Sequence, residues 1–177
     1  MIFGLFRRDP NRQVIERLHG EIMAAARQPA LFLDFGVADT VEGRFEALTL
    51  IAAIALRRMS RLPPPAGQLA QQLTDAIFAH FDVAMREMGV ADVGVAKRMK
   101  TLAQGFLGRS AAYGTALDQG GCELEAAILR NVYGGQGSAA SLAAYAVSCA
   151  AALETADLTT YLKGPLPFPP APSTEAR

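Results

Sequence analysis

The sequence predicts an all-α protein: a single-domain bundle of about six helices followed by an extended, Pro-rich C-terminal tail. Apolar residues recur along most of the chain at the spacing of amphipathic helices. They make up 51% of the 177 residues, enough for a core. Ala is abundant, and no convincing pair of strands is present, which favours helix over sheet.

We expect residues 1–163 to form the helical domain and residues 164–177 to form the tail. The tail, "GPLPFPPAPSTEAR", contains five of the chain's ten Pro residues, which favours extended or disordered chain. Leu166 and Phe168 on this stiff segment are candidates to cover a groove of the same or a neighbouring molecule. The simpler alternative is a loose tail without a binding role.

The first predicted helix begins at Asp9 and Pro10, which suit the N-cap and the first helical position. One apolar stripe follows at helical spacing: Val14, Leu18 and Ile22. Pro29 ends this helix. Residues 30–38, "ALFLDFGVA", are predicted to form a buried connector.

The second predicted helix starts where Asp39 and Glu42 have capping-box spacing, with Asp39 as the N-cap. The Pro-rich stretch "RRMSRLPPPAG" ends the helix and supplies a turn. Its inward stripe consists of Val41, Phe45, Leu48, Ala52 and Leu56.

Two further helices are predicted on either side of a break in "MREMGVADVGVAKRMK", residues 85–100. The first covers residues 67–88, and the second runs from Asp92 to about Leu117. Gly89 suits the left-handed residue that ends a helix, and Asp92 suits the next N-cap. We expect this break to reorient the chain and to direct the cations that follow outward. The expected inward residues are Leu69, Leu73, Ile77 and Phe81, then Val95, Met99, Leu102, Phe106 and Tyr113.

A fifth helix is predicted over residues 122–133, and Ser138 is predicted to cap a sixth helix that runs through Leu153. The loop between them, "GGQGS", is interpreted as a flexible turn. A phosphate site is disfavoured there, because no strand precedes the loop and no Lys follows it. A break near Asp157 separates off "LTTYLK".

The sequence contains no arrangement typical of catalysis. His19 and His80, its two His, lie on different predicted helices, and no metalloprotease, hydrolase or P-loop motif is present. Cys122 and Cys149 belong to no CxxC pair and are interpreted as reduced, packed thiols. We therefore expect no enzymatic activity, no cofactor and no metal.

We expect no secretory signal or transit peptide at the N-terminus. The N-terminal "MIFGLFRRDP" has too short an apolar run for a secretory signal. No window approaches the roughly 20 apolar residues of a membrane-spanning helix. We expect a soluble protein that at most touches a membrane surface.

Lys97, Arg98 and Lys100 are close together on the fourth predicted helix, and Arg109 follows about three turns later. One interpretation is a solvated helix face. The other is a docking surface for an anionic partner such as ribosomal RNA or acidic lipid. No aromatic residues interleave with these cations, which disfavours single-strand recognition by base stacking. Three arginines of the second predicted helix and the turn after it are candidates to extend this surface: Arg57, Arg58 and Arg61.

Three stretches taken together resemble the ubiquinol–cytochrome c chaperone family. They are "DTVEGRFE" (39–46), "FAHFDVAMREMGVADVGVAKRMK" (78–100) and "FLGRSAAY" (106–113), in matching order and spacing. The resemblance covers roughly residues 30–155. The best-matched positions are Asp39, Glu42, Gly43, Arg44, Asp82, Arg86, Gly89, Asp92, Lys97, Lys100 and Arg109.

We divide the charged and glycine positions into two groups. Candidates for partner binding are Arg86, Lys97, Arg98, Lys100 and Arg109. Candidates for a structural motif are Asp39, Glu42, Gly43, Arg44, Asp82, Gly89 and Asp92. Gly43 is expected to let a neighbouring helix approach, since a helical Gly otherwise costs about 1 kcal/mol relative to Ala. Arg44 and Arg86 are expected to pair with helix carboxylates, Arg86 with Asp82 at i−4.

The resemblance implies an all-helical assembly factor and no enzyme. Its mitochondrial relatives help newly made cytochrome b into ubiquinol–cytochrome c reductase, complex III. They work with a small helical partner protein and associate with the ribosome near the tunnel exit. The composition suggests a bacterial relative in the cytoplasm, with the cytoplasmic face of the inner membrane as a place of peripheral contact.

Three functional hypotheses follow. A chaperone for cytochrome b should expose an apolar groove between helices. A helical adaptor that docks on the ribosome or an anionic membrane surface, without a specific client, should show only a basic face. An enzyme, which would need a closed pocket with convergent polar groups, is disfavoured.

Overall fold

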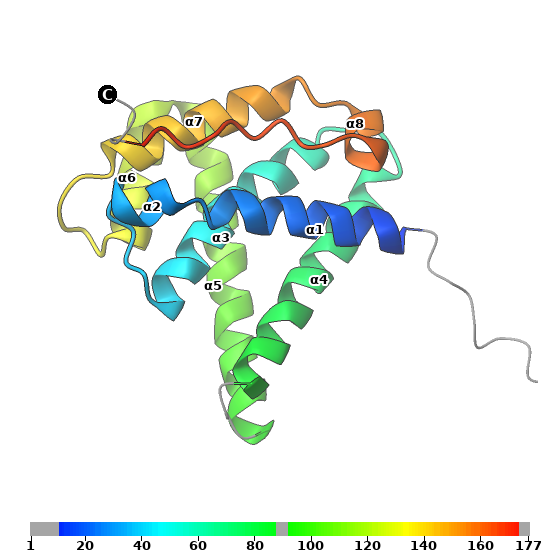
Figure 1. Ribbon diagram of the computed structural model, residues 1–177, viewed down its shortest axis with the longest axis horizontal. Helices are drawn as coiled ribbons and strands as arrows, with labels where there is room; N and C mark the ends of the chain where they lie inside the picture. The colour runs from blue at the N-terminus through cyan, green and yellow to red at the C-terminus, as the bar shows by residue number, and fades with distance from the viewer. Residues whose placement is uncertain (1–10, 88–91, 174–177) are drawn as a thin grey trace, which may run out of the picture.

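The computed structural model describes residues 11–87 and 92–173, and all regular structure in these residues is helical, as predicted. The helices form one domain (Figure 1). They are α1 (Arg12–Ala26), α2 (Pro29–Leu33), α3 (Val41–Met59), α4 (Ala66–Glu87), α5 (Asp92–Gln119), α6 (Gly121–Val132), α7 (Ala140–Glu154) and α8 (Leu158–Lys163).

Helix α3 lies at the centre of the domain, against α1, α5 and α7. The sequence predicted that only one face of α3 is buried, but most of its surface is buried. Residues on nearly every side of it are at most 4% exposed: Ala47, Leu50, Ile51, Ala53, Ile54 and Ala55. Val41, predicted to face inward, is 59% exposed at the first position of the helix. The Ala-rich sequence of α3 lets other helices approach from several sides, which a one-stripe pattern does not anticipate.

Helix α1 buries Leu18 and Ile22 completely, as predicted, and ends at Ala26. The predicted start at Asp9 and Pro10 lies outside the described residues. Pro29 does more than end the helix, because it begins α2, which replaces part of the predicted connector. Pro suits this first helical position, where its missing N–H needs no partner.

The entry into α3 differs from the predicted capping box. Thr40, not Asp39, is the N-cap: its backbone is extended and its hydroxyl accepts a hydrogen bond from the Gly43 amide at 3.1 Å. The Asp39 carboxylate instead pairs with Arg44, Oδ1 to Nε, at 2.6 Å. A Cβ on Gly43 would lie 1.9 Å from the Ala38 carbonyl oxygen. Gly43 therefore accommodates the preceding connector, not a neighbouring helix.

The predicted break between the third and fourth helices is confirmed, since α4 ends at Glu87 and α5 begins at Asp92. Figure 1 shows these two helices converging at the lower end of the view. Gly89 and the side chain of Asp92 lie outside the described part of the chain, so their capping roles stay predictions. The predicted inward residues Leu69, Leu73, Ile77, Val95, Phe106 and Tyr113 are at most 1% exposed.

The C-terminal elements follow the predicted order with two local differences. Ser138 accepts a hydrogen bond from the Ala140 amide at 3.3 Å, but the N-cap position of α7 is Ala139, one residue later. Cys149 is buried as predicted, whereas Cys122 is exposed. Asp157 caps α8 by accepting from the Thr160 amide at 2.8 Å. Residues 164–173 are extended, as expected, and packed against the helices, with Leu166 only 7% exposed.

Candidate functional site

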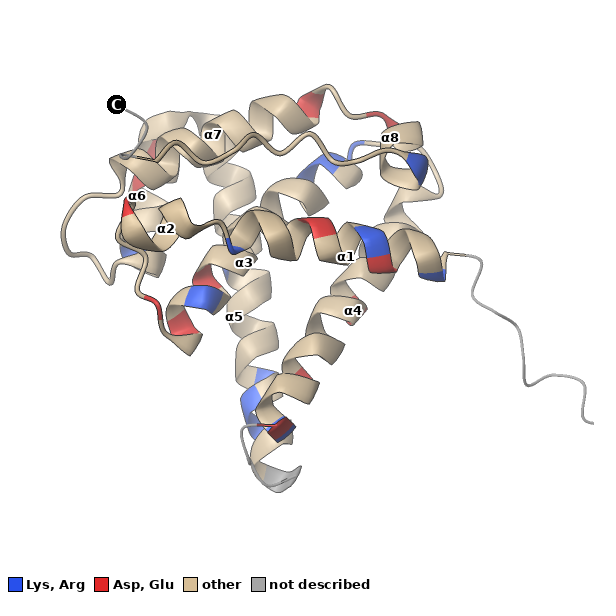
Figure 2. Ribbon diagram, viewed as in Figure 1, with Lys and Arg blue, Asp and Glu red and all other residues tan. Residues whose placement is uncertain are grey.

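Lys97, Arg98 and Lys100 are all exposed on the N-terminal part of α5 and form what we call the basic surface. Figure 2 shows Lys and Arg (blue) on α5 near the end where α4 and α5 converge. The outward direction expected for them is confirmed by their exposure. This position leaves the basic surface accessible to a large anionic partner.

Arg109 does not join the basic surface. Its Nε lies 2.6 Å from Glu46 Oε2 in α3, and its guanidinium carbon lies 5.7 Å from the centre of the Phe45 ring. The Arg109 side chain is 29% exposed and that of Glu46 is 10% exposed. Arg109 thus links α5 to α3 inside the domain. Its role in the fold is structural, whereas the sequence had made it a candidate for partner binding.

The environment of Glu46 is electrostatically unfavourable for a carboxylate. Burial raises its pKa, and the charge and hydrogen bond of Arg109 oppose that shift. Nearby on α3 and α5 are further buried polar groups: Thr49 and the hydroxyls of Ser110 and Tyr113. Burial and the Glu46 charge raise the pKa of Tyr113. These groups stay neutral, and the Glu46–Arg109 pair carries the local charge.

The other predicted ion pairs are local. Asp82 and Arg86 pair along α4 at 2.7 Å, as their i, i+4 spacing predicts. Arg44 pairs with Asp39 in place of a helix carboxylate, and its guanidinium carbon lies 5.5 Å from the Phe32 ring centre. Arg86 and Arg44 are thereby both held in internal interactions.

Arg57, Arg58 and Arg61 do not extend the basic surface. Arg57 Nη1 lies 2.9 Å from Glu154 Oε1, and Arg61 Nη2 lies 2.6 Å from Asp118 Oδ1. Arg57 also pairs with Asp118. This network joins α3 to α5 and α7, and its two carboxylates offset most of the positive charge within the domain.

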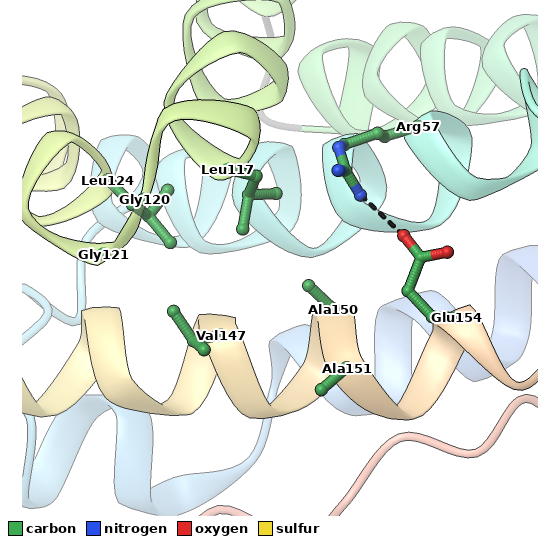
Figure 3. Close-up of a pocket in the computed structure, with 9 residues that line it drawn as sticks. All are labelled: Arg57, Leu117, Gly120, Gly121, Leu124, Val147, Ala150, Ala151 and Glu154. Atoms are coloured by element: carbon green, nitrogen blue, oxygen red, sulfur yellow. Dashed lines mark hydrogen bonds and ion pairs between the residues drawn. The ribbon is translucent and has the colours of Figure 1, made fainter.

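An open apolar groove lies beside this network (Figure 3). It has a volume of about 280 Å³, and the Arg57–Glu154 pair closes one end. Val147 from α7 is 42% exposed in it. We call it the α7 groove; its lining is Arg57, Leu117, Gly120, Gly121, Leu124, Val147, Ala150, Ala151 and Glu154.

Sequence reasoning named none of the apolar residues of the α7 groove as binding residues. The available signal was "AASLAAYAVSCAAAL", a helix without a polar face. When such a helix lies at the surface, some apolar side chains must meet solvent. The groove between helices is the feature expected of a client chaperone and not of a purely basic adaptor.

Metal and membrane-spanning features are not found in the described residues. No group of three or more His, Cys, Asp or Glu side chains there could hold a metal ion. No described helix is long and apolar enough to cross a membrane. His19 and His80 do face each other, with ring centres 5.3 Å apart, and burial together with the His80 charge lowers the pKa of His19.

These features define a single all-α domain with an open apolar groove and a separate basic surface. The family model for ubiquinol–cytochrome C chaperones matches residues 33–168, and the chain belongs to this family. The resemblance seen in the three sequence stretches is therefore confirmed.

A solved relative supports the same assignment. The crystal structure of the Cbp3 homolog from Brucella abortus is 38% identical in sequence, with a TM-score of 0.82. The match covers 96% of this chain and 97% of that one. No curated protein matches the chain.

Proposed function

We propose that this protein is an assembly chaperone that binds newly made cytochrome b and assists the biogenesis of ubiquinol–cytochrome c reductase. The observation that carries the proposal is the family match over residues 33–168. The relative with 38% identity over nearly the whole chain supports it.

The α7 groove gives the proposal a physical basis. A membrane protein that has not yet been inserted exposes apolar side chains to water. A groove of about 280 Å³ accepts only a few of them. Each buried side chain contributes about 1.5–3 kcal/mol before the costs of association, so we expect the groove to bind a client segment weakly and reversibly.

A deletion strain tests the proposal. Loss of the gene should lower the b-type haem absorbance of complex III and leave the other respiratory complexes intact. Normal complex III levels in a clean deletion would overturn the proposal.

Complementation of that strain tests the groove itself. Val147→Asp places a charge in the α7 groove at an exposed position, so it should leave the protein folded but fail to restore the haem signal. Val41→Asp, at another exposed Val, is the matched control and should restore it. Full rescue by Val147→Asp would assign client binding to another surface.

A second candidate function rests on the basic surface. Exposed Lys97, Arg98 and Lys100 suit a helical adaptor that docks on the ribosome near the tunnel exit or on the cytoplasmic face of the inner membrane. Such an adaptor would act from the cytoplasm and need no specific client. A small helical partner protein is compatible with either function.

A further inference from the structure

The C-terminal tail is held in a cleft by side chains from three places in the fold. Arg17 and Glu21 come from α1, Gln28 lies between α1 and α2, and Tyr145 comes from α7. Arg17 donates to the carbonyl of Gly164, where the tail begins. We call the surface formed by these four side chains the tail cleft. Figure 1 shows the tail running along α7.

The cleft satisfies the backbone of a proline-rich segment. Between Pro165 and Pro172 the residues that carry an N–H are Leu166, Phe168 and Ala171. The Leu166 amide donates to Glu21 Oε2 at 2.9 Å, and the Ala171 amide donates to Gln28 Oε1 at 2.5 Å. The Phe168 amide donates within the tail, to the Leu166 carbonyl at 2.8 Å. Every donor of the segment therefore has a partner.

The carbonyl side is recognised as well. The Tyr145 hydroxyl donates to the Pro169 carbonyl at 3.1 Å, and Gln28 Nε2 donates to the same oxygen at 3.5 Å. These contacts are to backbone atoms, so they do not depend on the side chains of this particular segment. An extended, Pro-stiffened segment also loses little conformational entropy on binding.

The tail fills the cleft only in part. Among the described tail residues, 164–173, Leu166 alone has a nearly fully buried side chain, while Pro165, Pro167, Pro170 and Pro172 are exposed. A space of about 680 Å³ adjoins the tail beside Phe35 and Tyr145. A second space, of about 320 Å³, lies beside Leu33, which is 82% exposed. A segment with larger apolar side chains would bury more surface here than the tail does.

We propose that the tail cleft is a binding site for extended, proline-containing segments and that the tail is its resident competitor. The external ligand is such a segment of another protein, with an apolar side chain at the position of Leu166. A tethered competitor has a high effective concentration, so the ligand binds well only when the tail leaves. This inference is independent of the identity of the client in the α7 groove.

The test uses a fluorescent peptide, GPLPFPPAPS, with the sequence of residues 164–173 and a fluorescence anisotropy readout. The full-length Leu166→Asp/Phe168→Asp variant, whose tail lacks its apolar contacts, should bind the peptide at least about tenfold more tightly than the unaltered chain. Adding Gln28→Ala should weaken that binding about tenfold, because it removes the hydrogen bonds to Pro169 and Ala171. Gln71→Ala, on the exposed face of α4, is the matched control and should have no effect.

Equal peptide binding by the variant and the unaltered chain would overturn the proposal, and so would insensitivity to Gln28→Ala. If circular dichroism shows that the tail variant has lost its helices, the proposal is tested instead by hydrogen exchange of the unaltered chain. Excess peptide should then speed exchange of the Leu166 and Ala171 amides about tenfold, since it displaces the tail. Unchanged exchange would overturn the proposal.

Discussion

Arg109 and Glu46 form a charged contact between α3 and α5, with Nε and Oε2 2.6 Å apart. Because the Glu46 side chain is only 10% exposed, water compensates its charge poorly. Arg109 supplies the counter-charge and covers the Phe45 ring. At the scale of the single residue, the role of Arg109 is thus to make a carboxylate tolerable at a helix interface.

This pair predicts a pH dependence of stability. Burial raises the folded-state pKa of Glu46 above its ordinary value of 4.5, so the folded state holds the proton more tightly than the unfolded state. The resulting stabilisation is present at low pH and is lost as pH rises through the folded pKa. The difference in free energy of unfolding between Glu46→Gln and wild type should therefore rise in favour of Glu46→Gln as the pH increases from 4.5 through the folded pKa of Glu46.

Urea denaturation at a series of pH values measures this difference. Glu123→Gln is the control for loss of an exposed carboxylate. Curves for Glu46→Gln and wild type that run parallel at all pH values would contradict the prediction. Arg109→Met, which removes the counter-charge, should cost on the order of 1–3 kcal/mol, and Glu46→Gln in the same chain should recover part of it.

At the scale of the element, the N-terminus of α3 depends on several short contacts. The Thr40 hydroxyl binds the Gly43 amide, and Asp39 holds Arg44 across the first turn. The Ala38 carbonyl oxygen occupies the space where any other residue at position 43 would place its Cβ. Gly43 therefore lets the connector turn closely onto the central helix.

Gly43→Ala should lower the free energy of unfolding by about 1–3 kcal/mol, because the added methyl group and the Ala38 backbone cannot both keep their positions. Gly20→Ala is the matched control: it is also helical, and its added Cβ would meet nothing within 4 Å. It should stabilise the protein by about 0.5–1 kcal/mol through backbone entropy. Chemical denaturation of both variants checks this. If Gly43→Ala and Gly20→Ala change the free energy of unfolding by similar amounts, the close approach of Ala38 to Gly43 has no energetic effect.

At the scale of the whole molecule, the two candidate surfaces are far apart. Lys100 and Leu117 lie on one helix, separated by about 25 Å at 1.5 Å per residue. The Arg57 network lies at one end of the α7 groove, whereas the basic surface lies on α5 near the end where α4 and α5 converge (Figures 1 and 2). The two surfaces therefore share no residue, and each can be altered without changing the other.

Reversing Lys97, Arg98 and Lys100 to Glu should weaken co-sedimentation with ribosomes or anionic vesicles. It should barely alter the melting temperature, because exposed charges contribute about 0–1 kcal/mol. Binding of the wild type should also fall as salt is raised. Arg130→Glu/Lys163→Glu, which reverses exposed cations elsewhere, is the control. If neither the triple reversal nor added salt changes co-sedimentation, the basic surface is a solvated helix face without a binding role.

Local features of the molecule were accessible from the sequence. Helical periodicity located most helices, and the Gly89–Asp92 stretch marked the boundary that the structure has between Glu87 and Asp92. The Asp82–Arg86 pair followed from i, i+4 spacing. Such features depend on neighbours within one or two turns, which is the range that a pattern in one sequence records.

Tertiary contacts decided the rest. Arg57 reaches Asp118 and Glu154, Arg109 reaches Glu46, and Gln28 reaches the tail, all across long stretches of chain. Each of these side chains could equally have faced solvent from its place in the chain, so composition and spacing leave its partner undetermined. The partner is set by which helices lie side by side, and that arrangement follows from the burial of the whole core around α3. For the same reason the α7 groove and the tail cleft exist only in the folded chain.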